Sequence, residues 1–146
     1  MEIGWLNIAK GITRVAEQIF RGALKYQKVK TKNRKKTADL LDRIAKDVLS
    51  IAKELRKGRL PHESCAAVRV YSQELQPLIR RVYSKKVADR IGWELIVVCN
   101  NRQLARAIFD SRRRAVSVAA DIKALTSTME AAAGTIKASA NIIRAL

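Results

Sequence analysis

Residues that break helices or promote sheets are scarce in this sequence of 146 residues. It contains six glycines, two prolines and only 5% aromatic residues. Sandwiches and barrels with many strands need frequent turn residues, so this scarcity excludes them and permits long, uninterrupted helices. Hydrophobic residues make up 48% of the chain, and its length suits one domain with a single core. We therefore expect an all-α globular domain.

Cysteines and long apolar runs are also scarce. Cys65 and Cys99 lie far apart in the sequence, and Glu2 stands where a secretory signal would carry positive charge. We therefore expect reduced thiols in a cytoplasmic protein. The longest unbroken apolar run covers residues 95–99, whereas a membrane-spanning helix needs about 20 apolar residues. The sequence thus predicts no constitutive membrane span.

Catalytic and metal-binding patterns are not recognisable in the sequence. The single histidine, His62, lies beside Pro61 in an expected loop, and neither a phosphate-binding glycine loop nor a nucleophile elbow is recognisable. His62 and Cys65 together are too few ligands for a structural zinc site. We therefore predict that the protein is not an enzyme and has no metal or cofactor.

Apolar residues at three- and four-residue intervals predict an amphipathic, basic first helix over residues 3–26. A connector over residues 25–36 follows, with seven cations and no acid. Thr37 is expected to cap a second helix that ends before Gly58. The core face of this second helix carries Leu41, Ile44, Val48, Ile51 and Leu55.

Further helical patterns follow in the second half of the chain. Pro61 is expected to begin a third helix, in which Pro77 predicts a kink or a division into two shorter helices. A fourth helix is expected from Lys85. Beyond residue 100 the spacing allows one long helix or two, with a change of composition near Leu125. We expect an up-down four-helix bundle over residues 1–125 and an accessory or linker helix over residues 126–146, packed on the bundle or paired with another helix.

Positive charge is clustered along the chain. There are 30 Lys and Arg against 13 Asp and Glu, a formal charge of +17. Besides residues 25–36, two later clusters contain Arg80, Arg81, Lys85 and Lys86, and Arg102, Arg106 and residues 112–114. Such an excess favours a polyanionic partner, either an anionic membrane or nucleic acid. The amphipathic first helix favours the membrane, since no nucleic-acid-binding motif is recognisable and aromatic stacking platforms are few.

The order and spacing of these helices resemble a known family. Residues 3–6 open the amphipathic helix, and the second helix leads through Gly58 and Pro61 to a helix with Cys65, Leu75 and Leu78. Residues 83–86 then precede an apolar helix through Trp93. Over residues 3–125 the chain resembles the N-terminal four-helix bundles of cell-death proteins. These include the mixed-lineage kinase domain-like pseudokinases, fungal HeLo domains and the powdery-mildew-resistance type of coiled coil in plant immune receptors.

This resemblance implies a module that self-associates, moves from the cytoplasm to the plasma membrane and permeabilises it in regulated cell death or immune signalling. It also implies regulation by further domains of a longer protein. Carried over by position, the membrane-inserting residues are Ile3, Trp5, Leu6, Ile8 and Ile12. The residues expected to bind anionic lipid are Lys10, Arg14, Arg21, Lys25, Lys28, Lys30, Lys32, Arg34, Lys35 and Lys36.

Two other functions are compatible with the same sequence. The first is a basic helical bundle that binds nucleic acid through its phosphates. The second is an adaptor that only promotes oligomerisation, through a helix over residues 118–146, without damaging a membrane.

Overall fold

The structure, a computed structural model, describes residues 5–99 and 117–146. These residues form α-helices joined by short connections and contain no strand, which confirms the predicted all-α class. The elements in chain order are α1 (Trp5–Gly22), the 3₁₀ helix η1 (Ala23–Lys28), α2 (Thr31–Arg56), α3 (His62–Ile79), α4 (Lys85–Val98) and α6 (Ser117–Ala145).

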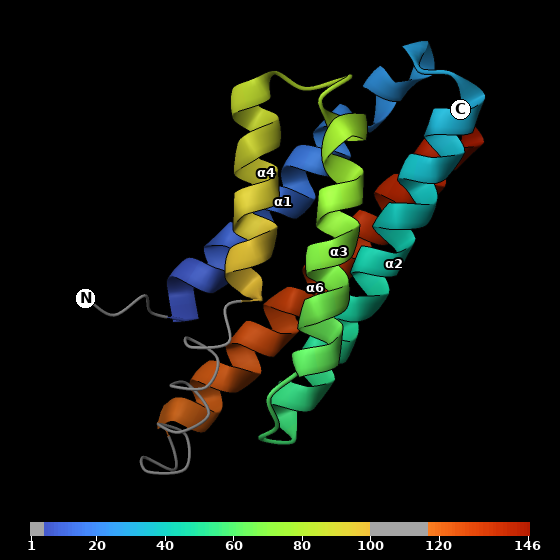
Figure 1. Ribbon diagram of the computed structural model, residues 1–146. Coiled ribbons are helices and arrows are strands. Elements are labelled where there is room, and N and C mark those ends of the chain that lie inside the picture. The colour runs from blue at the N-terminus through green and yellow to red at the C-terminus, as the bar shows by residue number, and fades with distance from the viewer. Residues whose placement is uncertain (1–4, 100–116) are drawn as a thin grey trace.

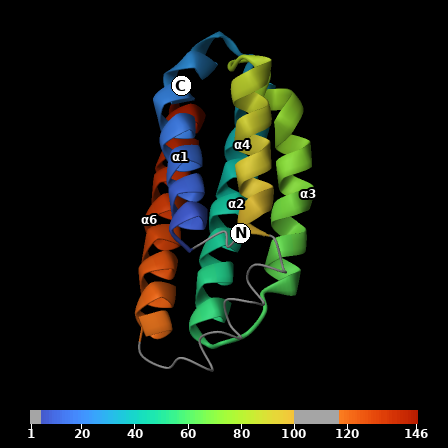
Figure 2. The ribbon, with the colours of Figure 1, turned by 90° about the vertical axis from the view of Figure 1, so that its left-hand side faces the viewer.

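The helices form a ring around one core. From α1 to α4 the chain runs up and down the bundle in turn, as Figures 1 and 2 show. α6 lies between α1 and α2 and packs against both, while α3 packs against α2 and α4, and α4 packs against α1. The first and second helices of the chain are therefore separated by the last one.

Helix α6 fits between α1 and α2 because its inner face combines large and small side chains. This face buries Leu125, Met129, Ala132, Ala133, Ile136, Ala140 and Ile143. Alanines allow neighbouring helix axes to approach closely, and the larger side chains fill the space toward the centre. Residue 125, where the sequence suggested a boundary, lies inside α6, is itself buried, and is followed by further buried residues as far as Ile143. The C-terminal residues of the chain thus pack on the bundle.

The predicted apolar stripe of the first helix forms one wall of the core. Ile8, Ile12, Val15, Ala16 and Ile19 are all buried. The α-helix ends at Gly22, earlier than residue 26, and the chain tightens into η1, which buries Ala23 and Tyr26. Figure 1 shows α1 in dark blue rising along the bundle and η1 in lighter blue at its upper end, where the chain turns into α2.

Helix α2 begins six residues before the predicted cap, so Thr37 as its N-cap was wrong. Thr37 is buried within the helix, and its hydroxyl donates a hydrogen bond to the Asn33 carbonyl at 2.7 Å. Arg34 stabilises the earlier start, since its guanidinium donates to the Val29 carbonyl at 2.8 Å and to the Thr31 hydroxyl at 3.2 Å. Lys and Arg are good helix formers, so residues 31–36 extend the helix instead of forming a connector.

The structure confirms the predicted end of the second helix and the predicted start of the third, but it shows no division of the third helix at its proline. The predicted core face of α2 is buried, and Gly58 follows the helix with φ +71°, a conformation that favours glycine. Pro61 directly precedes α3. Pro77 does not divide α3, which continues to Ile79 and ends within one turn of the proline. The proline offers no backbone N–H to the carbonyl four residues before it, and α3 ends two residues after the proline.

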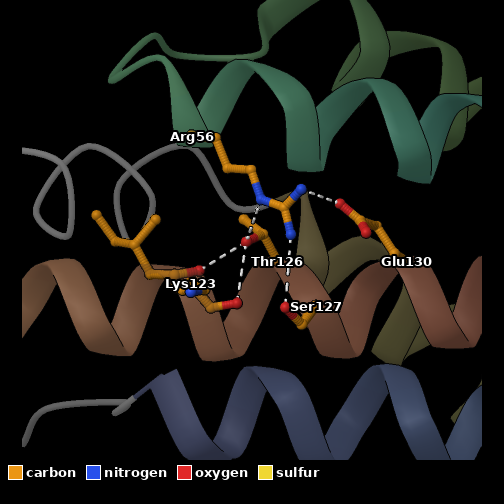
Figure 3. A network of polar contacts seen from close by, with 6 residues as sticks. Arg56, Lys123, Thr126, Ser127 and Glu130 are labelled. Carbon is orange, nitrogen blue, oxygen red and sulfur yellow. Dashed lines mark hydrogen bonds and ion pairs between the residues drawn. The ribbon is translucent and has the colours of Figure 1, made fainter.

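A polar network fastens the end of α2 to α6 (Figure 3). The Arg56 guanidinium donates to the Thr126 hydroxyl at 2.9 Å and forms an ion pair with Glu130 at 2.5 Å. Thr126 in turn donates to the Ile122 carbonyl at 2.9 Å. At the other end of the same interface, Arg144 of α6 forms ion pairs with Asp39 and Asp42 of α2. Polar contacts thus fix the register of α6 on α2 at both ends.

Candidate anion-binding surface

Two groups of cations that are far apart in the sequence lie at the same end of the bundle. In an up-down arrangement, η1 and the start of α2 reach the end where α3 passes into α4 (Figures 1 and 2). We call this the basic end. Its cations are Lys25, Lys28, Lys30, Lys32, Arg34, Lys35, Lys36, Arg80, Arg81, Lys85 and Lys86.

A groove at the basic end brings both groups together. It has a volume of about 780 Å³ and lies between η1 and the turn after α3. We call it the basic groove. Its lining residues are Leu24, Lys25, Gln27, Lys28, Val29, Lys30, Arg81 and Val82. Four of these residues are cationic and none is acidic. Leu24 is 63% exposed, so a large apolar side chain lies directly beside the cations.

The acids closest in sequence to the basic end already have partners. Arg144 of α6 approaches Asp42 at 2.6 Å and Asp39 at 3.1 Å, and Arg80 pairs with Asp89 at 3.1 Å. Among the residues that the structure describes, no carboxylate forms an ion pair with the remaining lysines of the basic end or with Arg81. These cations are exposed, so their positive potential is directed toward solvent.

Two cations of the basic end also have structural contacts. Arg34 holds the connection between η1 and α2, as described above. The Lys25 ammonium lies 5.7 Å from the centre of the Tyr83 ring, which attracts a cation over its face. Lys28, Lys30 and Lys32 have no such contact within the described ranges and are fully available to a ligand.

The other three predicted lipid-binding residues lie along α1, and two of them are paired. Arg14 forms an ion pair with Glu94 of α4 at 2.8 Å, and Arg21 lies 3.9 Å from Glu17. Lys10 is exposed, about 18 Å from Gly22 along the helix axis. The structure therefore brings residues 25–36 together at one end and leaves Lys10 and Arg14 apart from them.

The predicted membrane-inserting residues are only partly described. Ile8 is 2% exposed and Ile12 is fully buried against the bundle core. Trp5 and Leu6 belong to α1, but their side chains lie outside the described part of the structure, as does Ile3. No helix within residues 5–99 and 117–146 is long and apolar enough to span a membrane. Contact of the Ile8 and Ile12 side chains with lipid therefore requires α1 to leave the bundle.

The residues considered for catalysis and metal binding differ in exposure. His62 is exposed at the first position of α3, whereas Cys65 and Cys99 are buried free cysteines. The described residues contain no group of three or more His, Cys, Asp or Glu side chains that could hold a metal ion. The third cationic cluster, at Arg102, Arg106 and residues 112–114, lies outside the described ranges.

Arg81 was not among the predicted lipid-binding residues, although it lines the basic groove. It lies more than 40 positions after Lys36 in the sequence, and only the up-down order of the helices places it beside η1. Two sequence features could have predicted its role. Arg81 belongs to the second cationic cluster, and this cluster lies at the expected end of the third helix.

No protein-family model, curated protein or solved structure matches this chain. The resemblance to the helical bundles of cell-death proteins therefore stays a prediction.

Proposed function

We propose that this domain binds anionic phospholipid through its basic end and, after self-association, permeabilises the membrane. The observation that carries this proposal is the basic groove, in which four cations and no acid surround the exposed Leu24. Cations beside an exposed apolar side chain suit the interface of a bilayer, where phosphate groups lie next to acyl chains. A purely cationic surface would favour any polyanion equally.

Electrostatic attraction supplies the initial binding. A lysine near an anionic leaflet contributes about 1 kcal/mol, and its field decays over a Debye length of about 8 Å at physiological salt. Cations scattered over a globular surface cannot all lie within that distance of a flat membrane. The four cations of the basic groove line a single opening, so they can approach the same membrane together.

Helix α1 is the element proposed to enter the membrane. Its apolar face, which includes Ile8 and Ile12, is suited to the bilayer interface once it leaves α4 and α6. Its departure would expose apolar faces of α4 and α6, which a second copy of the chain could cover. The setting in regulated cell death or immune signalling rests on the resemblance alone.

The test compares two matched triple variants of the full chain. Lys28, Lys30 and Lys32 are exposed at the basic end, whereas Lys46, Lys53 and Lys57 are exposed elsewhere on or just after α2. Replacing either set by Gln removes three positive charges. The first variant should bind phosphatidylserine vesicles about 100-fold more weakly, because about 3 kcal/mol is lost, and the second should bind nearly as tightly as the wild type. Co-sedimentation measures binding, and release of a trapped dye measures permeabilisation.

Three outcomes would contradict the proposal. Equal losses in the two variants would mean that total charge, and not the basic end, determines binding. Tight binding to nucleic acid with no binding to vesicles would support the nucleic-acid alternative. Vesicle binding and oligomerisation without dye release would refute permeabilisation and favour the adaptor.

A further inference from the structure

An open groove of about 390 Å³ lies on the outer surface between α3 and α4. It brings together Gln73, Gln76 and Arg80 from α3 with Asp89, Trp93 and Ile96 from α4. Trp93 is 66% exposed and Ile96 is 37% exposed. Tryptophan is highly buried on average in folded proteins, so an exposed ring beside a groove points to a binding surface.

The packing of α3 on α4 leaves the Trp93 ring on the surface. Gln76 occupies the space between the two helices beside Trp93, since a Cβ atom at Gly92 would lie 2.7 Å from the Gln76 Oε1 atom. The Gln76 amide nitrogen donates a hydrogen bond to Asp89 at 3.3 Å, which holds this side chain in place. Trp93 therefore stays open to solvent within the described part of the chain.

Unpaired cations lie on the same face of α4 as Trp93. Lys86 precedes Trp93 by seven residues and Arg90 precedes it by three, and residues at these spacings share one face of a helix. Both cations are exposed, and no described carboxylate forms an ion pair with either. The acid of the groove, Asp89, already pairs with Arg80 at 3.1 Å. This face of α4 thus combines an exposed aromatic ring with unpaired positive charge.

The groove is continuous with the basic end. Arg80 belongs to both, and Lys85 and Lys86 begin α4. Trp93 lies about 12 Å from Lys85 along the helix axis, at a rise of about 1.5 Å per residue. A bundle standing on its basic end would hold Trp93 away from a flat surface. A bundle tilted toward α3 and α4 brings the ring and the cations to that surface together.

We infer that the face of α4 with Lys86, Arg90 and Trp93 is a second membrane-binding surface, whose Trp93 ring anchors the protein in the interfacial region of an anionic bilayer. Tryptophan suits this region because its ring is apolar while its indole N–H can still reach water or lipid oxygens. The neighbouring cations attract anionic headgroups. This inference rests on the proposed function and adds an orientation, with the bundle tilted onto α3 and α4.

A membrane fits this surface better than a protein partner does. Trp93 and Ile96 are the exposed large apolar residues of α4 in the described part of the chain. A stable protein interface buries about 800 Å² on each partner around an apolar core, which two side chains beside unpaired cations do not provide. A membrane anchor needs only an aromatic ring at the depth of the headgroups and cations close to them.

The first test follows the fluorescence of Trp93 in the full chain. The sequence contains two tryptophans, so Trp5→Phe leaves Trp93 as the only one. Phosphatidylserine vesicles are added until they sediment all of this variant. Its emission should then shift to shorter wavelength, and bromine atoms on the acyl chains should quench it. Vesicles of phosphatidylcholine alone, which have no net charge, should change neither.

The second test measures vesicle binding by co-sedimentation. Trp93→Ala should bind phosphatidylserine vesicles about tenfold more weakly, as expected if about 60 Å² of apolar ring surface leaves water on binding. Trp93→Phe keeps an aromatic ring and should retain most of the affinity. The control is Leu49→Ala, which removes an exposed apolar side chain from α2 and should bind as tightly as the wild type. Both positions are exposed, so circular dichroism should show unchanged helix content.

Three results would overturn the inference. The first is vesicle binding with unchanged Trp93 emission, and the second is equal binding of Trp93→Ala and Leu49→Ala. The third is loss of a dimer in Trp93→Ala without vesicles, measured by analytical ultracentrifugation, which would assign this face to a second copy of the chain. All three leave the proposed function intact, whereas a wild type that binds no vesicles refutes that function and this inference together.

Discussion

The contact between Gly22 and Tyr83 gives the sharpest test of the packing at the end of α1. A Cβ atom at position 22 would lie 1.9 Å from the Tyr83 hydroxyl oxygen and 2.3 Å from its Cζ atom. Gly22 has φ −90° and ψ −2°, a conformation open to any residue. Gly22→Ala therefore destabilises the protein through steric overlap and not through backbone strain. The buried Tyr83 ring must move to make room for the new methyl group.

Moving the ring has a definite energetic cost. The Tyr83 hydroxyl donates to the Gln18 carbonyl at 2.8 Å, and losing this bond costs about 1 kcal/mol. Overpacking costs a further ~2 kcal/mol, whereas alanine in place of glycine returns up to about 1 kcal/mol of helix propensity. We expect a net loss of about 2 kcal/mol in the free energy of unfolding, or about 4–8 °C in Tm.

Urea denaturation followed by far-ultraviolet circular dichroism measures this loss. A second measurement places Gly22→Ala in a Tyr83→Leu background, where the hydroxyl and the outer ring are gone. There the substitution should become neutral or stabilising, since only the gain in helix propensity remains. Gly134→Ala on α6 is the control, because its Cβ meets no atom within 4 Å, and it should stabilise by up to about 1 kcal/mol. An equal effect of Gly22→Ala in both backgrounds would refute the proposed contact.

Two further predictions concern charge. Burial raises the pKa of Tyr83 to about 12, because it disfavours the charged phenolate. The neutral side chain therefore contributes its full share to the free energy of unfolding below pH 10, and this contribution is lost as the pH rises through 12. The stability difference between the wild type and Tyr83→Phe, measured in urea, should therefore shrink from pH 9 to pH 12; a constant difference would contradict this. Arg144→Ala should cost about 1 kcal/mol because it leaves Asp39 and Asp42 without their shared partner. High salt should reduce this cost, and Lys137→Ala, an exposed control on α6, should have little effect.

Periodicity predicted the helices and their buried faces because both are local properties. A helix repeats every 3.6 residues, so Leu41, Ile44 and Val48 share one face whatever surrounds them. The left-handed Gly58 after α2 was predictable for the same reason. The start of α2 was not, since the cap preference of Thr37 is weaker than the packing that buries it and the contacts that Arg34 makes upstream.

The candidate site was predictable only in its parts. Clustering of cations over residues 25–36 was evident from the sequence, as was the second cluster around Arg81. Their meeting in one groove required the direction of every helix to be known. The same applies to the contact between Gly22 and Tyr83, because nothing in the sequence around either residue indicates it.

The sequence by itself determined that the chain is helical, basic and able to form one core, because composition and periodicity act on each segment independently. Only the tertiary structure decided which segments became neighbours. The insertion of α6 between α1 and α2 depends on how alanine-rich and bulky faces fit in three dimensions. The same kind of long-range packing brings the two cationic clusters together in the basic groove, since pairing across long stretches of chain is set by packing and not by local spacing.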